Sequence, residues 1–145
     1  MINFTEGKIK IKERDISVAT SCDDLKSLSK EGLIEEQEGN GGRTFYYVEA
    51  VVDTMRFGAF IRLHQKKIEW LLLRWLDRPM KSWDDASEKG LNDEYRLLLN
   101  LVENKVGRPP DSKKNRQRMW RFKWGQIQVS YEPRSFEVAI FMVPR

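Results

Sequence analysis

Hydrophobic and polar residues alternate along much of this chain, most densely between Thr44 and Leu76. Every second residue is apolar in three successive runs, at Thr44–Asp53, at Met55–Leu63 and from Ile68 onward. A period of two is typical of β-strands with one buried face. The stretch therefore predicts three consecutive antiparallel strands that supply most of the core.

The third run, Ile68–Leu76, is apolar on both faces towards its end, which predicts that this part is covered on both sides. A helix is the competing interpretation, because a short apolar run does not reveal its type by period alone. Asp77-Arg78-Pro79 ends the run within strand length. We therefore interpret Ile68–Leu76 as a strand.

Alternating runs towards both ends of the chain predict further strands. Lys8–Lys12 turns two isoleucines inward and three lysines outward, which suits an edge strand, and Asp15–Ala19 is interpreted as the second arm of a hairpin. In the C-terminal part, three alternating runs are separated by turn residues, over Trp120–Trp124, Ile127–Tyr131 and Phe136–Met142. These runs predict a β-hairpin or meander.

A short segment from Ser21 has the spacing of an amphipathic helix. Ser21 stands three residues before Asp24, close to the capping-box pattern that satisfies free amides at a helix start. Leu25 and Leu28 form a short inward stripe, and Gly32 is a natural stop. The predicted helix is too short to be stable without packing on the sheet.

A longer helix is predicted further along the chain, with Asn92 or Asp93 as its N-terminal cap and Gly107 at its end. Pro109 and Pro110 follow and prevent its continuation. Its apolar residues recur at helical spacing, which predicts a helix that covers the apolar face of the sheet: Tyr95, Leu98, Leu99, Val102 and Val106.

Together these patterns predict an α+β fold, with a twisted antiparallel sheet of about six to eight strands and two helices packed against it. With 145 residues, the chain is expected to form a single domain over 1–145. A composition of 40% hydrophobic and 33% charged residues is that of an ordinary globular protein.

The sequence also restricts where the protein works. No apolar run approaches the ~20 residues of a membrane span, so no membrane partner is expected. The N-terminus lacks the order of charges and apolar residues of a signal peptide, and a single cysteine, Cys22, excludes an internal disulfide framework. These features predict a cytoplasmic protein.

Charge is distributed unevenly along the chain. Residues 1–54 carry 7 basic and 11 acidic side chains, whereas residues 55–145 carry 19 basic and 11 acidic ones, which gives the overall net charge of +4. Such asymmetry can steer charged partners.

The sequence offers little catalytic chemistry. The chain has a single histidine, His64, and a single cysteine, Cys22. A zinc site at His64 would therefore have to rely on carboxylates. Cys22 stands at a predicted helix start, where a thiolate is favoured, but His64 is its only candidate base. Adjacent carboxylates such as Asp84-Asp85 lie in polar surroundings that do not tune a pKa. We therefore predict that the protein is not an enzyme and uses no cofactor or metal.

Two acid-rich segments are candidates for contact with a basic protein partner. Six residues carry this prediction: Glu35, Glu36, Glu38, Asp84, Asp85 and Glu88. The first three belong to Glu35–Arg43, which is interpreted as a flexible acidic and glycine-rich loop. A glycine-rich phosphate cradle is a sharper alternative for this loop, but the Gly-Lys-Ser/Thr ending and the following helix are both missing.

The segment Lys113–Lys123 is strongly basic and has aromatic residues interleaved. Its basic side chains are candidates for phosphate contacts: Lys113, Lys114, Arg116, Arg118, Arg121 and Lys123. Trp120 or Phe122 would then stack on bases. Alternation favours the opposite interpretation, with Trp120, Phe122 and Trp124 together on a core face and the basic residues on the other.

The C-terminal part, in which Gly-Arg-Pro-Pro precedes WRFKWGQIQVSYEPRSFEVAIFMV, and the central meander resemble small bacterial cytoplasmic proteins, among them immunity proteins of contact-dependent and polymorphic toxin systems. The resemblance implies a non-catalytic protein that binds and neutralises a cognate protein toxin. Many such inhibitors are acidic, and the net positive charge departs from that pattern. The alternative is a nucleic-acid-binding module that uses Lys113–Lys123.

Overall fold

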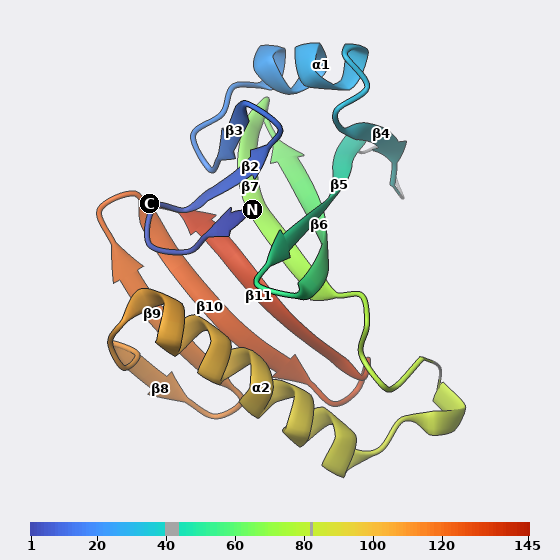
Figure 1. The fold of residues 1–145 in the computed structure, drawn as a ribbon, viewed down its shortest axis with the longest axis vertical. Helices are drawn as coiled ribbons and strands as arrows, with labels where there is room; N and C mark the ends of the chain where they lie inside the picture. The colour runs from blue at the N-terminus through green and yellow to red at the C-terminus, as the bar shows by residue number, and fades with distance from the viewer. Residues whose placement is uncertain (40–43, 82) are drawn as a thin grey trace.

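The computed structural model describes residues 1–39, 44–81 and 83–145, and it has an α+β architecture with two antiparallel sheets (Figure 1). The larger sheet has eight strands in the order β4-β5-β6-β7-β11-β10-β9-β8. In chain order they are β4 (Glu35–Glu38), β5 (Thr44–Val52), β6 (Met55–His64), β7 (Lys67–Trp75), β8 (Ser112–Lys114), β9 (Gln117–Phe122), β10 (Gly125–Glu132) and β11 (Glu137–Pro144).

The smaller sheet consists of three strands from the N-terminus, in the order β1-β2-β3. The helices follow at two separate places in the chain, and a short 3₁₀ turn, η2, precedes the second helix. The bounds of these elements are β1 (Ile2–Asn3), β2 (Lys8–Ile11), β3 (Arg14–Ser17), α1 (Cys22–Lys30), η2 (Trp83–Asp85) and α2 (Glu88–Val106). The predicted fold class is therefore confirmed, and the N-terminal hairpin forms a sheet of its own.

The alternation in the central strands separates one buried face of the large sheet from one open face. In β5, Tyr46 and Val48 are buried, whereas Tyr47 is half-buried and Glu49 is exposed. Each strand pairs antiparallel with its neighbour in register, so that the inward residues of adjacent strands lie side by side. The three predicted central strands are confirmed, and their inward residues form the middle of the core.

A register shift in β7 changes the predicted face of one residue. The alternation predicts Ile68, Trp70 and Leu72 on one face, but the pairing with β6 shifts between Arg62 and Leu63. Ile68 consequently pairs with Leu63 and is buried in the core, whereas Trp70 pairs with Arg62 on the open face. A β-bulge of this kind inserts one residue and re-aims the side chains beyond it.

Two covers bury the core face of the large sheet. Helix α2 packs across β10 and β11, in the lower part of Figure 1, and its Tyr95 ring lies 5.6 Å from the ring of Tyr131. The small sheet packs on β5 through β1 and β2, and α1 lies beyond it at the top of the molecule. The prediction that the longer helix covers the sheet is confirmed.

The ends of the helices follow the predicted chemistry in part. Ser21 accepts a hydrogen bond from the backbone N–H of Asp24 and caps α1, and Gly107 ends α2 in the left-handed conformation. The predicted start of α2 at Asn92 or Asp93 is wrong, because Ser87 is the cap. Its side chain accepts from the N–H of Gly90, which adds a further turn of helix.

Two further predictions need correction. Glu35–Glu38 forms the edge strand β4 rather than a loop, because its backbone pairs with Thr44–Tyr47 of β5. The glycine-rich remainder at 40–43 lies outside the described residues. The lysine-rich strand β2 lies between β1 and β3 and is not an edge strand. Neither helix that the structure describes is long and apolar enough to cross a membrane.

Gly125 is a sensitive point for the stability of the large sheet. It has a φ of +152°, and a Cβ there would overlap the backbone carbonyl oxygen of Val143 in the neighbouring strand. We expect Gly125→Ala to lower the free energy of unfolding by about 3 kcal/mol. Gly32→Ala is the matched control, because Gly32 also has a positive φ but no heavy atom lies within 4 Å of its Cβ position.

The control substitution should cost only the left-handed backbone conformation, about 1 kcal/mol. Urea unfolding of both variants measures the difference. Equal losses in the two variants would contradict the proposed overlap with Val143.

Candidate functional site

The open face of the large sheet carries a group of aromatic side chains that are only half-buried. Tyr47 and Phe60 pair across β5 and β6, and their ring centroids lie 5.0 Å apart. Phe45 lies 6.1 Å from Phe60. On the next strands, Trp70 meets Phe141 edge to face at 5.7 Å. These contacts hold the rings in fixed positions on a face that no helix in the described chain covers.

Two arginines lie over these rings. The Arg62 guanidinium lies 5.5 Å from the centre of the Trp70 ring, and that of Arg74 lies 5.6 Å from the centre of the Phe60 ring. Each is also held by one carboxylate. Arg62 Nε is 3.1 Å from Glu69 and Arg74 Nη2 is 2.6 Å from Glu137. Stacking and pairing together orient both guanidinium groups.

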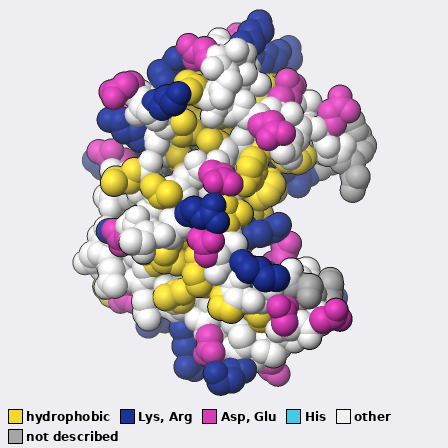
Figure 2. Space-filling view, turned by 45° about the vertical axis from the view of Figure 1, so that its right-hand side comes forward, with side chains coloured by type: hydrophobic (Ala, Val, Ile, Leu, Met, Phe, Trp, Pro, Cys, Tyr) yellow, Lys and Arg dark blue, Asp and Glu magenta, His cyan; other side chains and the backbone are white. Residues whose placement is uncertain are grey.

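The rings and the arginines line a hollow of about 410 Å³. Phe45, Phe60, Trp70 and Leu72 make its apolar walls, and no acidic side chain is among its described lining residues. Figure 2 shows hydrophobic side chains together with dark blue Lys or Arg and magenta Asp or Glu side chains around the indentation on the right of that view. We name the hollow with its two arginines the aromatic–arginine site.

Sequence reasoning missed this site because it treated aromatic and aliphatic residues as interior. A signal was present in the chain. In β5, β6 and β7, large apolar residues also occupy the positions opposite to the core face, at Phe45, Phe60, Trp70 and Leu72. Apolar residues on both faces of a strand indicate either that a second element covers the outer face or that this face is an exposed apolar surface.

The first predicted acidic group lies at the border of this face. Glu35, Glu36 and Glu38 are exposed on β4, the edge strand beside β5. None of them forms an ion pair with another residue that the structure describes. Gly39, directly after the strand, lines the hollow. The acidic edge therefore borders the aromatic–arginine site. Glu35 shares the face of the site through its pairing with Tyr47, whereas Glu36 and Glu38 alternate to the other face.

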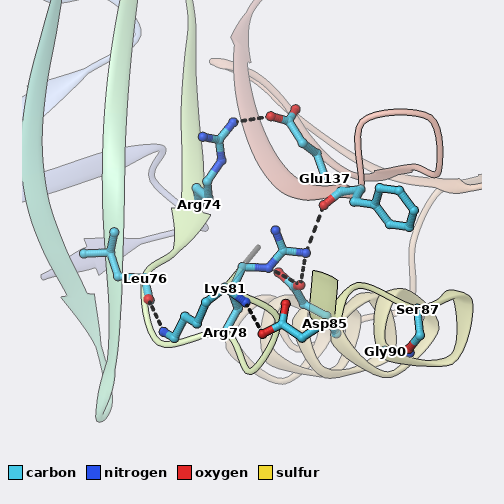
Figure 3. Close-up of polar contacts among 10 residues, drawn as sticks. Arg74, Leu76, Arg78, Lys81, Asp85, Ser87, Gly90 and Glu137 are labelled. Carbon is cyan, nitrogen blue, oxygen red and sulfur yellow. Dashed lines mark hydrogen bonds and ion pairs between the residues drawn. The ribbon is translucent and has the colours of Figure 1, made fainter. Parts of the chain in front are cut away.

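The second predicted acidic group lies apart from the first. Asp84 and Asp85 belong to η2 and Glu88 to the first turn of α2, in the lower right of Figure 1, whereas β4 is at the upper right. Asp85 accepts a hydrogen bond from the backbone N–H of Lys81 at 3.1 Å (Figure 3). A carboxylate in the first turn of a helix, as at Glu88, is favoured by the helix N-terminus. The structure thus gives two of these residues local structural roles.

The basic segment does not form a single stripe. Lys113 and Lys114 are exposed on the edge strand β8, and Arg121 and Lys123 are also exposed. Arg116 lies over the ring of Tyr131 at 5.7 Å. Arg118 shares the inward face of β9 with Trp120, and its guanidinium donates to the backbone carbonyls of Lys114 and Gln117.

The aromatic residues of this segment and the neighbouring Trp124 make contacts within the protein, and Phe122 and Trp124 are only half-buried. Trp120 is fully buried and donates a hydrogen bond to the carbonyl of Arg108. Phe122 stacks on Trp124 at 5.3 Å, and Trp124 donates to the carbonyl of Thr5. The interior interpretation holds for Trp120, which therefore cannot stack on bases. Nucleic-acid binding by the exposed basic residues stays a prediction.

The remaining candidate chemistry is dispersed. Cys22 is the first residue of α1, and His64 is exposed at the end of β6. No hydrogen bond joins the two within residues 1–39, 44–81 and 83–145. In that part of the chain, no three side chains of the metal-binding types gather to hold a metal ion.

A buried ion pair fastens α2 to the large sheet. The Glu94 side chain is almost fully buried, and its Oε1 lies 2.7 Å from Arg78 Nη2. Arg78 also donates to the carbonyl of Phe136, in the turn before β11 (Figure 3). Burial raises the pKa of Glu94 above its ordinary value, although Arg78 and, more weakly, Arg74 oppose the shift.

Comparison with protein-family models, with curated proteins and with solved structures gives no match. The resemblance to immunity proteins consequently rests on the sequence pattern alone. Any function has to be argued from the surfaces described above.

The Glu94 carboxyl should make stability depend on pH in a defined direction. Its pKa is higher in the folded protein than in the unfolded chain, so the folded state holds the proton more tightly. The free energy of unfolding therefore falls as pH rises from the unfolded to the folded pKa. Glu94→Gln removes this contribution, and we expect wild type to lose stability relative to Glu94→Gln as pH rises. Urea unfolding of both proteins between about pH 4 and pH 8 measures this difference in the free energy of unfolding.

A second variant tests the pair itself. Arg78→Ala leaves the ionised Glu94 buried without its partner, and we expect a loss of about 3–5 kcal/mol near neutral pH. The loss should shrink in acid, where Glu94 is protonated. Arg134→Ala, an exposed arginine in the nearby turn, should stay within about 0.5 kcal/mol of wild type. A pH-independent loss in Arg78→Ala would contradict this account.

Proposed function

We propose that this protein is a non-catalytic binding protein of the immunity type, which binds a cognate protein toxin and neutralises it by occlusion. The observation that best supports the proposal is the open face of the large sheet. There, half-buried aromatic side chains and two arginines lie together at the aromatic–arginine site.

The side-chain types at this site are those that dominate protein–protein interfaces. Tryptophan, tyrosine and arginine are enriched among the residues that carry most binding energy, and they act best when held rigid in the free protein. Here each guanidinium is stacked on a ring and paired with a carboxylate, and each ring contacts another ring or a guanidinium. A partner would therefore meet a surface that is already ordered.

The acidic edge supplies the complementary part of the interface. Three exposed carboxylates stand on β4, the strand that ends the large sheet. Glu35 pairs with Tyr47 on the open face that carries the aromatic–arginine site, whereas Glu36 and Glu38 alternate to the face of Tyr46. A basic region on the partner, such as a nuclease cleft, would be attracted to this edge before the apolar contact forms. Occlusion of that region requires no reaction on either side.

The decisive experiment uses the protein encoded directly before this chain, since the resemblance implies that an immunity gene follows its toxin gene. The two proteins are produced separately, and their affinity is measured by isothermal titration calorimetry. We expect a dissociation constant of about 1 nM or below, and survival of cells that produce both. Absence of binding together with unrelieved growth arrest would remove the proposal.

Charge reversal on β4 should slow association with that partner. We expect Glu35→Lys/Glu36→Lys/Glu38→Lys to lower the association rate constant by about tenfold or more at low salt, with little change in the dissociation rate constant. The effect should weaken as salt is added. Surface plasmon resonance at several salt concentrations measures both constants.

The control carries the same change in net charge at exposed carboxylates elsewhere, Glu13→Lys/Asp15→Lys/Glu103→Lys. It should associate nearly as fast as wild type. Equal slowing by both triple variants would mean that overall charge, and not the β4 edge, steers the partner.

A further inference from the structure

The aromatic–arginine site has a composition that selects among partners. Its walls are apolar, with Phe45, Phe60, Trp70 and Leu72, while Arg62 and Arg74 are the charged groups among its described lining residues. The carboxylates that pair with these arginines, Glu69 and Glu137, do not line the hollow. Glu69 lies close to Nε of Arg62, and Glu137 lies close to Nη2 of Arg74. A guanidinium has five N–H donors, so donors remain for a ligand.

We propose that the aromatic–arginine site binds a protruding aromatic side chain of the partner protein that is flanked by carboxylates. The inference rests on the proposed function and names the chemistry of the partner segment. The aromatic ring fills the hollow against Trp70 and Phe60. The flanking carboxylates receive hydrogen bonds from Arg62 and Arg74 at the rim.

The size and shape of the hollow agree with this occupant. Its volume of about 410 Å³ lies near the lower end of the range for sites that bind organic groups, about 300–1,000 Å³. It lies on the face of a sheet rather than inside the protein, and its ring-bearing residues are half-buried. A free small molecule there would stay largely in water, whereas a protein surface covers the hollow and its rim together.

Charge complementarity also divides the interface into two parts. The arginines can donate to an acidic group at the hollow, and Glu35, on the same face of the adjacent edge strand, attracts a basic group. A partner that fits both therefore carries an acidic aromatic anchor beside a basic region. This arrangement disfavours partners of uniform charge, because one half of the contact would be repulsive.

The test uses the full chain and the heptapeptide acetyl-Gly-Ser-Glu-Trp-Glu-Ser-Gly-amide as the probe. Binding is followed by the ¹H–¹⁵N NMR signals of the Trp70 indole and of the Arg62 and Arg74 Nε–H groups. We expect these signals to shift with a dissociation constant of about 1 mM or below. Replacement of tryptophan by alanine, or of both glutamates by lysine, should weaken binding by about tenfold.

Three variants relate the binding to the arginines. Arg62→Gln/Arg74→Gln should weaken binding of the heptapeptide by about tenfold, and Glu137→Gln, which releases Arg74, should strengthen it by about twofold. Arg121→Gln/Lys123→Gln removes the same charge from exposed positions near the opposite edge and should leave binding unchanged. Circular dichroism verifies that all variants are folded.

Several results would overturn the inference. These are the absence of shifts at Trp70, equal binding of the lysine peptide, and equal sensitivity to the control substitutions. Indole-3-acetate should bind at least about tenfold more weakly than the heptapeptide. Equal or tighter binding of this free acid would assign the hollow to a small molecule instead.

The cognate protein separates this inference from the proposed function. If it binds wild type and Arg62→Gln/Arg74→Gln with equal affinity, the aromatic–arginine site is not the anchor point and the proposed function stands. If the heptapeptide binds as expected while the cognate protein does not, the site is supported and the proposed toxin partner is wrong.

Discussion

The structure depends on burying one face of an eight-stranded sheet with two covers that are far apart in the sequence. The small sheet from the N-terminus packs on β5, and α2 packs on β10 and β11. Neither cover reaches the whole face, so the sheet is sealed only when both are in place. The short helix α1, with 9 residues, has no independent stability and depends on the same packing. Two segments far apart in the sequence are thus tied to a single core.

The Arg78–Glu94 pair gives the second cover a fixed position. Arg78 follows β7, Glu94 belongs to α2, and the Phe136 carbonyl that Arg78 also contacts precedes β11. One guanidinium therefore links a strand end, a helix and a turn. The Glu94 Oε2 atom and the Tyr95 hydroxyl are buried without a hydrogen-bond partner among the described residues. Burial without full pairing makes the position of this helix sensitive to the protonation of one carboxyl group.

Much of the fold could be predicted from the spacing of apolar residues and from the residues at turns and helix ends. Burial of one face of a strand or helix requires this spacing. The central strands, the C-terminal strands and the caps at Ser21 and Gly107 follow directly. The edge strand β4 could not be recognised, since four polar residues at an edge carry no apolar alternation. The face of Ile68 depended on a bulge, which is a property of pairing between strands and not of one strand.

The candidate site was harder to predict than the fold. The acidic residues were recognisable as exposed, but their grouping depends on how β4 and η2 are placed, which the sequence does not state. The aromatic–arginine site arises from residues of three strands that pair in register, so it exists only once β5, β6 and β7 are aligned. Its aromatic residues look like core residues in the sequence, so the sequence pattern alone does not distinguish the two.

The order of the strands also has an electrical consequence. Carboxylates stand on β4 at one edge of the large sheet, and lysines stand on β8 at the other. The separation of these charges contributes an electric dipole moment across the strands of the large sheet. In the field of a charged macromolecule such a dipole experiences a torque, which turns the protein during approach. This contribution favours an orientation in which the β4 side faces a cationic surface during association.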